Sequence, residues 1–313
     1  MTKIWVTRPL PTPVIEALQG DVEVRSETVP LTGAEMRRAL RAFDAVIPTL
    51  GDVFDASVFD DVPQPRARLL ANFGVGYNHI DVAAARAAGV QVTNTPGAVT
   101  DATADIAMTL ILMSARRAAE GERLVRAGTW AGWHPTQMLG LHVTGKRVGI
   151  VGMGRIGQAI ARRCARGFDM EVLYFNRSAK DVDAQRVERL VDLAAQVDVL
   201  VVAVPGGAET RHMIDAQVLA AMQPHAHLIN IARGDVVAEA DLIAALQAGQ
   251  IGGAGLDVYE FEPQVPEALR ALDTVTLLPH LGTAAEEVRI AMGLMAVNNV
   301  NAVMAGAAPL NPV

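Results

Sequence analysis

The chain has one cysteine among its 313 residues and no long apolar run. The single thiol, Cys164, excludes an intramolecular disulfide and a metal site with several cysteine ligands, and we expect no metal. Cys164 falls in a stretch of helical periodicity, which predicts a buried thiol. The most apolar stretch, residues 106–115, is too short to span a bilayer and has Asp105 and Arg116 at its ends.

Positive charge is also scarce. The 27 Lys and Arg residues against 34 Asp and Glu residues give a net charge of −7. Nucleic acids and anionic membranes attract proteins of the opposite sign, so neither is expected as a partner. The N-terminus runs from Met1 directly into the strand-like residues KIWV, without the basic and apolar regions of a secretion signal. These features predict a cytoplasmic protein.

Short runs of β-branched residues alternate with helical patterns along almost the whole chain, which is typical of βαβ units and parallel sheets. A loop at 128–140, GTWAGWHPTQMLG, separates two series of predicted strands. The strands lie at 4–7, 22–25, 45–48, 69–73 and 91–93, and then at 147–151, 171–175, 199–204, 227–231, 253–257 and 276–278. Helices are predicted between them near 13–19, 33–41 and 82–88, with one long segment at 100–127 and a last helix at 284–305.

The length of the chain favours two domains over one core. We predict an α/β protein with two Rossmann-like domains, each a doubly wound parallel sheet, and a cleft between them. The boundaries fall near Pro96 and Thr283. Residues 1–97 and 284–313 would form a discontinuous first domain, and residues 98–283 the second.

A glycine pattern follows the first strand of the predicted second domain. In VGIVGMGRIG, the glycines Gly152, Gly154 and Gly157 have the GxGxxG spacing, with Arg155 and Ile156 opening the next helix. The three glycines suit a tight turn, a close backbone approach to a pyrophosphate and close packing of helix on strand. A tight turn without a ligand is the alternative, but the strand and helix on either side favour dinucleotide binding.

The second strand of that domain ends in residues that bear on the choice of cofactor. A site specific for NAD would carry Asp or Glu here, whereas this chain has Asn176, followed by Arg177 and Ser178. Asn176 would not repel a 2′-phosphate, and Arg177 and Ser178 can donate hydrogen bonds to one. The pattern predicts a preference for NADP(H), with NAD(H) possible, although Arg177 could simply be a solvated surface residue.

Three polar residues follow three successive strands, where ligands bind in sheets of this kind. They are Arg233 in NIARGD, Glu262 in GLDVYEFEP and His280 in LLPHLGT. Reduction of a keto acid needs a cation for the carboxylate and carbonyl, an acid for the forming alkoxide, and a group that tunes this acid. Each residue alone could have a structural role, and His134 in the loop is a rival histidine. Together they predict hydride-transfer chemistry.

The motifs VGIVGMGRIG, NIARGD, GLDVYEFEP and PHLGT occur in the order seen in the D-isomer-specific 2-hydroxyacid dehydrogenase family, which this chain resembles. NFGVGYNHID and TNTPGAVTDATADIA resemble patterns of its first domain, which binds the substrate, while the second binds the dinucleotide. The resemblance implies that Arg233 binds the substrate carboxylate and carbonyl, that His280 is the acid–base, and that Glu262 is its partner. It implies further cofactor contacts at Thr103, Val204, Pro205, Ala232, Asp257 and Gly282, and substrate contacts at Leu50, Val75 and Gly76.

GTWAGW and NRS look most like the glyoxylate/hydroxypyruvate reductase branch of that family. This implies reduction of a small 2-keto acid with NADPH. A phosphorylated substrate would need extra cations, and Leu50–Gly51 and Phe73–Gly74 offer none. A reductase of another keto acid, an enzyme like phosphoglycerate dehydrogenase, and a dinucleotide-sensing scaffold without turnover are the alternatives. The apolar long helix and the loop with Trp130 and Trp133 favour a homodimer, with burial inside the monomer as the alternative.

Overall fold

Two parallel sheets organise the chain in the computed structural model, which describes all 313 residues. The first sheet belongs to a compact unit of Met1–Val99 and Ala284–Val313, called unit 1 below. The second belongs to Thr100–Thr283, called unit 2. Every pair of neighbouring strands is parallel, which confirms the prediction of an α/β protein with two doubly wound sheets.

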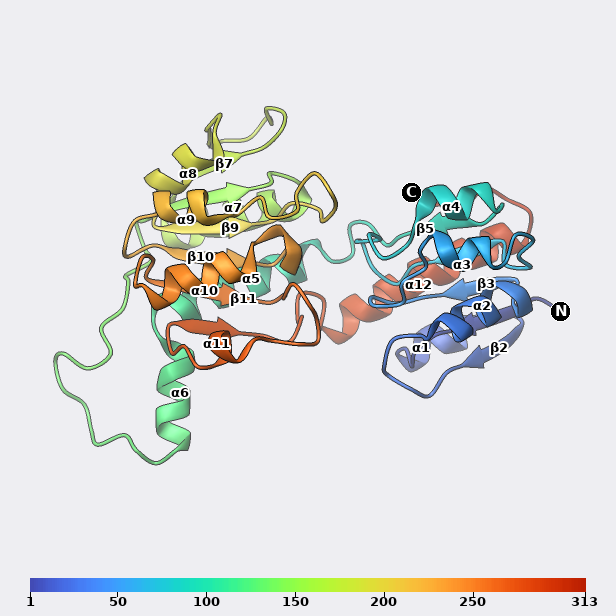
Figure 1. Cartoon of the computed structure of the whole chain (residues 1–313), viewed down its shortest axis with the longest axis horizontal. Coiled ribbons are helices and arrows are strands. Elements are labelled where there is room, and N and C mark those ends of the chain that lie inside the picture. Colours follow the sequence, from blue (N-terminus) through green and yellow to red (C-terminus); the bar gives the residue numbers. More distant parts are fainter. The chain divides into compact units, whose positions relative to one another are not determined.

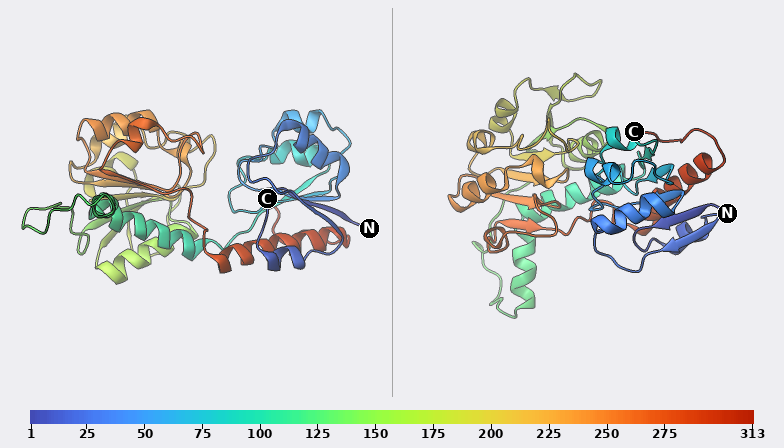
Figure 2. Two further views of the ribbon diagram at one scale, coloured as in Figure 1. Left: turned by 90° about the horizontal axis from the view of Figure 1, so that it is seen from below. Right: turned by 45° about the vertical axis from the view of Figure 1, so that its right-hand side comes forward.

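Unit 1 has a sheet of five strands in the order β2-β1-β3-β4-β5. The strands are β1 (Lys3–Val6), β2 (Asp21–Val24), β3 (Ala45–Ile47), β4 (Leu69–Ala71) and β5 (Gln91–Thr93). One face is covered by α2 (Gly33–Ala42), α3 (Ala56–Asp60) and α4 (Val82–Ala87), and the other by α1 (Thr12–Glu16) and α12 (Glu286–Met304) (Figures 1 and 2). The central strands β1, β3 and β4 are almost entirely buried, as expected for parallel strands covered on both faces.

Side-chain caps mark where the helices of unit 1 begin. Thr32 and Glu35 form a capping box at the start of α2. Asp55 accepts a hydrogen bond from the N–H of Val58 in α3, and Asp81 one from the N–H of Ala84 in α4. Each cap begins a helix directly after the loop at the carboxyl end of a strand, so it helps to fix the conformation of that loop.

Unit 2 has a sheet of seven strands in the order β12-β11-β10-β9-β6-β7-β8. The strands are β6 (Arg147–Val151), β7 (Glu171–Phe175), β8 (Gln185–Arg186), β9 (Val199–Val202), β10 (His227–Asn230), β11 (Gly253–Leu256) and β12 (Val275–Leu277). α5 (Thr100–Ala115) and α7 (Arg155–Phe168) pack on one face (Figure 2). α8 (Leu190–Gln196), α9 (Ala216–Ala221), α10 (Glu239–Gln247) and α11 (Glu267–Arg270) pack on the other.

Each sheet has a point at which the direction of winding reverses. In unit 1 the reversal lies between β1 and β3, and in unit 2 between β6 and β9. Ligands of open α/β sheets bind outside the carboxyl ends of the strands at such points. The residues that follow β1, β3, β6 and β9 are therefore the first to consider for ligand binding.

The prediction of one helix over 100–127 is wrong. The helix ends at Ala115, Arg117 adopts a left-handed conformation with φ of 52°, and a separate helix α6 (Ala118–Arg126) follows. The N–H of Leu141 takes the carbonyl of Ala115 as its acceptor, at 2.8 Å, and so competes with continuation of α5. A side chain at Gly140 would come within 2.4 Å of that carbonyl, so a glycine is needed for this approach.

Two short elements, α3 and the strand β8, were not expected from the sequence. Because of β8, the second sheet has seven strands where six were predicted. Cys164 is buried in α7, and burial raises the pKa of its thiol to about 12. No helix has the length and apolar character required to cross a membrane.

Candidate active site

The glycine loop between β6 and α7 has the geometry of a phosphate-binding turn. Gly152 has φ of 101°, a conformation that disfavours side chains, and a side chain at Gly157 would approach the carbonyl oxygen of Gly152 to 2.1 Å. A side chain at Gly154 would meet no atom within 4 Å, so the backbone there borders open space. Gly154 is the N-cap of α7 and no side chain caps this helix, so its first N–H groups are available to an anion. These residues fit a dinucleotide.

Arg155 at the start of α7 is exposed, whereas Ile156 is half-buried and packs against the core. Val204 and Pro205 follow β9, which is the other strand of the switch point. Val204 packs against the core, and the carbonyl of Pro205 accepts a hydrogen bond from the Thr210 hydroxyl at 2.7 Å. The structure thus places these four residues around the carboxyl ends of the two central strands of unit 2.

Asn176, Arg177 and Ser178 form a loop directly after β7. Asn176 Oδ1 accepts a hydrogen bond from the N–H of Met153 at 3.2 Å, which joins this loop to the glycine loop. The Asn176 Nδ2 group donates to the carbonyl of Ser178 at 2.9 Å. The side chain of Arg177 is 87% exposed and forms an ion pair with Glu209 at 2.9 Å, and exposed pairs of this kind contribute at most about 1 kcal/mol. Arg177 is therefore accessible to an anionic ligand.

Two charged residues of this region were missed in the sequence. Glu209 opposes Arg177, and Arg186 of β8 donates to the carbonyls of Asn176 and Arg177 at 3.3 and 3.4 Å. Arg186 belongs to the short strand that the sequence analysis missed, so its contact with the loop could not be anticipated.

Arg233 follows β10, and two glycines make room around it. A side chain at Gly206 would come within 2.7 Å of Arg233 Cγ. A side chain at Gly234 would collide with the backbone of Tyr259, at 1.8 Å from its carbonyl carbon. These glycines allow the loops after β9 and β11 to pack closely against Arg233. The Asn230 side chain, 1% exposed, accepts from the N–H of Ala232 and donates to the carbonyl of Arg233, and so holds the backbone of this turn.

Arg233 donates to the carbonyl of Ala232 at 2.7 Å. Burial lowers the pKa of Arg233, and the carboxylates of Glu262 and Asp235 act in the opposite direction. A purely structural role of Arg233 in a surface ion pair with Asp235 does not fit this half-buried position. Arg233 is a cation held beside Glu262.

Glu262 and His280 form the central contact of the site. His280 Nδ1 lies 2.9 Å from Glu262 Oε2, and both side chains are 30% exposed. Glu262 Oε1 accepts a second hydrogen bond from the N–H of Tyr259 at 3.0 Å. Burial alone would raise the pKa of Glu262, but the hydrogen bonds from His280 and Tyr259 and the charges of His280 and Arg233 lower it below its usual value.

Asp257 fixes the loop that carries His280. Its carboxylate is 1% exposed and accepts hydrogen bonds from the N–H groups of Leu281 at 2.6 Å and Gly282 at 2.8 Å. His280 has φ of 55°, which this tight turn requires. Burial raises the pKa of Asp257, opposed by these hydrogen bonds and by the charge of His280. The hydroxyl of Thr103 in α5 donates to the carbonyl of Gly282 at 3.1 Å, so Thr103 supports the same loop.

In unit 1, the loop at Val75 and Gly76 is held by amide side chains. Asn72 Nδ2 donates to the carbonyls of Gly74 and Gly76, both at 3.0 Å, and Asn94 Nδ2 donates to the carbonyl of Val75 at 2.8 Å. Asn72 Oδ1 lies 3.0 Å from His79 Nε2. These hydrogen bonds hold three successive carbonyls, and thereby the backbone of this loop, in place.

Asn72, Asn94 and His79 were not predicted from the sequence, although Asn72 and Asn94 each follow directly after a strand. The same positional signal had identified Arg233 and His280. Leu50 lies in the loop after β3, with 37% of its surface exposed. Leu50 itself carries no charge, but the sequence did not reveal the cation beside it: Arg8 donates to the Leu50 carbonyl at 2.6 Å. His134, the rival histidine, is exposed and lies 3.2 Å from the hydroxyl of Thr136, away from these residues in the chain and outside their contacts.

Residues 108–282 match the family model described as D-isomer specific 2-hydroxyacid dehydrogenase, NAD binding domain. The chain belongs to the D-isomer-specific 2-hydroxyacid dehydrogenase family. This dehydrogenase is 44% identical to glyoxylate reductase of Thermococcus kodakarensis, with 98% of this chain and 94% of the relative covered.

Solved structures give the same picture. The dehydrogenase superposes on the TT0316 protein of Thermus thermophilus with a TM-score of 0.92 at 39% identity, covering 99% of each chain. It superposes on the NADPH-dependent glyoxylate/hydroxypyruvate reductase of Sinorhizobium meliloti, in complex with NADP and malonate, with a TM-score of 0.87 at 37% identity. That comparison covers 100% of this chain and 96% of the other. The resemblance read from the motifs is thus confirmed over the whole length.

Proposed function

We propose that this dehydrogenase is a glyoxylate/hydroxypyruvate reductase that works in the cytoplasm and prefers NADPH. The observation that carries the proposal is the set of Arg233 and the hydrogen-bonded pair Glu262–His280, which follow the adjacent strands β10, β11 and β12. Relatives named glyoxylate reductase align with nearly the full chain, which supports the same substrates. Unit 2 would bind the dinucleotide, and unit 1 would supply substrate contacts.

The side chains divide the work according to their chemistry. Arg233 would bind the substrate carboxylate and polarise the keto oxygen, as a cation with several N–H donors can do. His280 would donate the proton to that oxygen, and Glu262 would hold the imidazole by its Nδ1 atom and stabilise its protonated form. The N–H groups of Val75 and Gly76 would hold the carboxylate from unit 1.

The dinucleotide would lie on the glycine loop, with Thr103, Val204, Pro205, Ala232, Asp257 and Gly282 as further contacts. When bound, the nicotinamide supplies the hydride for the reduction. The N-terminus of α7 would bind the pyrophosphate. Asn176, Arg177 and Ser178 would accept a 2′-phosphate, and the relative from Sinorhizobium meliloti is named as NADPH-dependent and was solved with NADP. These features favour NADPH over NADH.

A panel of substrates tests the proposal. Initial rates of NADPH and NADH oxidation would be measured with glyoxylate, hydroxypyruvate, pyruvate, phenylpyruvate and phosphohydroxypyruvate. We expect the highest kcat/KM for the first two, with NADPH. Preference for phosphohydroxypyruvate would favour an enzyme like phosphoglycerate dehydrogenase. Tight NADPH binding without turnover of any keto acid would favour a dinucleotide-sensing scaffold.

We also propose that the dehydrogenase forms a homodimer through α6 and the loop after it. This segment projects from its own unit in Figure 1, and α6 has no buried residue. Its large apolar side chains are exposed: Val125 by 60%, Trp130 by 51%, Trp133 by 78% and Leu139 by 68%. A cluster of this kind marks an interaction surface. The apolar part of the predicted long helix, α5, is buried inside the monomer, as the alternative held, so the dimer proposal rests on α6 and the loop after it.

Analytical ultracentrifugation tests the dimer. The wild type should sediment with twice the mass of the chain, and Trp133→Lys should shift it toward the monomer because a charge would enter an apolar interface. Val29→Lys is the matched control, since Val29 is likewise an exposed apolar side chain, by 60%, but lies in unit 1. A monomeric wild type, or equal effects of both substitutions, would reject this interface.

A further inference from the structure

The switch point of the unit 1 sheet carries a buried ion pair. Arg8 follows β1 and Asp52 lies in the loop after β3, and these are the two strands between which the winding reverses. Arg8 Nη2 lies 3.2 Å from Asp52 Oδ1, with 15% of the Arg8 side chain and none of the Asp52 side chain exposed. Ligands of doubly wound sheets bind at this position. The pair is thus placed where it can act on a ligand site.

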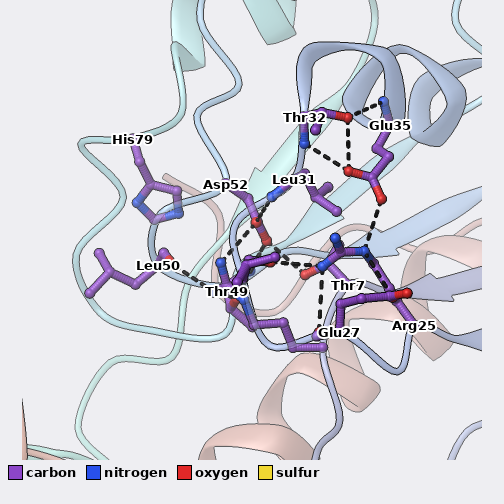
Figure 3. Close-up of polar contacts among 12 residues, drawn as sticks. Thr7, Arg25, Glu27, Leu31, Thr32, Glu35, Thr49, Leu50, Asp52 and His79 are labelled. Carbon is purple, nitrogen blue, oxygen red and sulfur yellow. Dashed lines mark hydrogen bonds and ion pairs between the residues drawn. The ribbon is translucent and has the colours of Figure 1, made fainter. Parts of the chain in front are cut away.

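Asp52 gathers three chain segments (Figure 3). It accepts hydrogen bonds from the hydroxyl of Thr7 at 2.7 Å, from the N–H of Thr49 at 2.9 Å and from the N–H of Leu31 at 3.0 Å. These donors come from the segments after β1, after β3 and before α2. A buried carboxylate with this many donors and a cation is fully satisfied, so it holds the three segments together.

Arg8 acts on the tip of the loop after β3. Its Nη1 atom donates to the carbonyl of Leu50 at 2.6 Å and also contacts the hydroxyl of Thr49. Residues Thr49–Asp52 form a turn in which the N–H of Asp52 donates to the carbonyl of Thr49 at 3.1 Å. Gly51, the third residue of the turn, has φ of 93°, which a type II turn requires. The carbonyl that Arg8 holds is therefore that of the central peptide of the turn.

The Leu50 side chain extends from the backbone of this turn, so a group that holds the turn also holds the position of that side chain. Type I and type II turns differ by a flip of the central peptide, and the hydrogen bond from Arg8 selects one of the two. Pro30 lies close to the turn, because a side chain at Gly51 would approach Pro30 Cγ to 3.2 Å. In Figure 3 the Leu50 side chain extends away from Asp52, on the side where His79 lies. His79 in turn contacts Asn72, which holds the Val75–Gly76 loop.

The charge of Arg8 is already neutralised. Its donors face Asp52, the Leu50 carbonyl and Thr49, so the guanidinium is committed to groups of the protein. A second acidic group on a substrate would have to compete with a buried carboxylate for this cation. The role open to Arg8 is therefore to position Leu50 and not to bind an anion.

We propose that Arg8, held by Asp52, is a positioning residue for substrate selection, which fixes Leu50 as an apolar wall beside the tail of the keto acid. The proposal rests on the proposed reductase function, with Leu50 among the substrate contacts. The tail is the group on the far side of the keto carbon from the carboxylate, a hydrogen in glyoxylate and a hydroxymethyl group in hydroxypyruvate. A rigid Leu50 would contact the second tail and hardly touch the first.

The test compares kcat/KM for these two substrates in Arg8→Met, which keeps the length and apolar stem of the side chain but has no donors. We expect the loss for hydroxypyruvate to be about tenfold larger than the loss for glyoxylate, mainly through KM, as for one group in an apolar pocket. Because Arg8→Met leaves the buried Asp52 without its cation and can fail to fold, Arg8→Lys, which keeps a charge beside Asp52, is measured in parallel. It should show the same selectivity change, to a smaller degree.

Arg25→Met is the matched control. Arg25 lies in the same group of contacts, where it pairs with Glu35 at 2.9 Å, but the structure gives it no contact with the turn at Leu50 (Figure 3). It should change the melting temperature without changing the ratio of kcat/KM values. In a Leu50→Ala background, Arg8→Met should cause no further change in that ratio, because the wall has been removed.

Equal losses for both substrates in Arg8→Met and Arg8→Lys, or the same change of ratio in Arg25→Met, would overturn the proposal. The wild-type rates separate this failure from a failure of the proposed function. If the wild type turned over neither keto acid, the reductase assignment would fall, and this inference with it. If it turned over both and the Arg8 variants kept the wild-type ratio, only the inference would fall.

Discussion

His280 Nδ1 and Glu262 Oε2 lie 2.9 Å apart, although 18 residues separate them in the chain. The contact forms because β11 and β12 are neighbours and each residue follows one of these strands. The glycine at 234 lets the loop with Tyr259 approach, and the hydrogen bond from the Tyr259 N–H then orients Glu262. Asp257 holds the turn of His280 through two N–H groups. The pair is thus oriented from both sides by backbone contacts.

This geometry predicts what loss of the pair does to the reaction. His280→Ala should lower kcat by ~10²–10⁴-fold, the usual contribution of a general acid, because the alkoxide would have to take its proton from water. Glu262→Gln should cause a smaller fall, since the amide oxygen can still accept a hydrogen bond from Nδ1–H but brings no charge. Affinity for NADPH, measured by fluorescence titration, should stay near the wild-type value in both variants. Near-normal turnover of His280→Ala would remove His280 from the mechanism.

The exposed ion pair of Arg177 with Glu209 allows the preference for NADPH over NADH to be tested. Arg177→Ala should weaken NADPH binding by about tenfold or more, the worth of one hydrogen bond to a charged group, and change NADH binding little. Glu209→Gln should strengthen NADPH binding a few-fold, because a carboxylate that competes for Arg177 and repels the phosphate is removed. Dissociation constants for both cofactors would be measured by calorimetry. Equal effects of Arg177→Ala on the two cofactors would contradict a 2′-phosphate site.

The amide clamp on the loop at Val75 and Gly76 predicts a defect in substrate binding. Asn72→Ala removes two donated hydrogen bonds, and we expect KM for glyoxylate to rise by about tenfold with a smaller change in kcat. Asn299→Ala is a matched control, because Asn299 is also buried in unit 1 and donates to Met295 and Asn311. It should cost similar stability and leave KM unchanged. A rise of KM in both variants would point to general loosening of the unit.

His227 predicts sensitivity to acid. Its ring lies at the start of β10, 7% exposed, with Nδ1 2.7 Å from the Ser114 hydroxyl, and burial together with the nearby His225 lowers its pKa from 6.5 to about 4. Below pH 6.5 the unfolded chain therefore takes up this proton before the folded chain does. The free energy of unfolding should fall as the pH drops from about 6.5 to about 4, by on the order of 3 kcal/mol, and this contribution should be constant below that.

The comparison of wild type with His227→Gln isolates this effect from other groups, among them the pair His225–Asp198. Urea unfolding would be followed at several pH values between 4 and 7. The wild type should lose its advantage over the variant as the pH falls. Parallel curves at all pH values would show that the ring is not held in its neutral form.

The sequence was sufficient for the sheets and for the residues at their ends. Buried parallel strands such as β4 and β9 are continuous apolar runs, and parallel strands bring their carboxyl ends to one edge, so Arg233, Glu262 and His280 could be expected together. The break after Ala115 could not be read, because it depends on a hydrogen bond from Leu141, which is distant in the chain. β8 is only two residues long, too short for any period to be recognised.

The supporting residues were the harder part of the site. Asn72, Asn94 and Asp52 act through backbone groups of loops, and such contacts leave no pattern in the sequence. Arg8 is 42 residues from Leu50, so its contact depends on β1 and β3 being neighbours in the sheet. The reactive side chains that follow strands could thus be predicted from their position in the sequence. The residues that orient them could be identified only once the order of the strands in the sheet was known.

The measurement that tests the central claim most directly is the product of hydroxypyruvate reduction. The protein would be incubated with hydroxypyruvate and NADPH, and the glycerate formed would be resolved by chiral chromatography. We predict one equivalent of D-glycerate for each equivalent of NADPH oxidised, and formation slower by ~10²–10⁴-fold with His280→Ala. Formation of L-glycerate, or NADPH binding without any glycerate, would contradict the assignment of this chain as a D-specific hydroxyacid dehydrogenase acting through Arg233, Glu262 and His280.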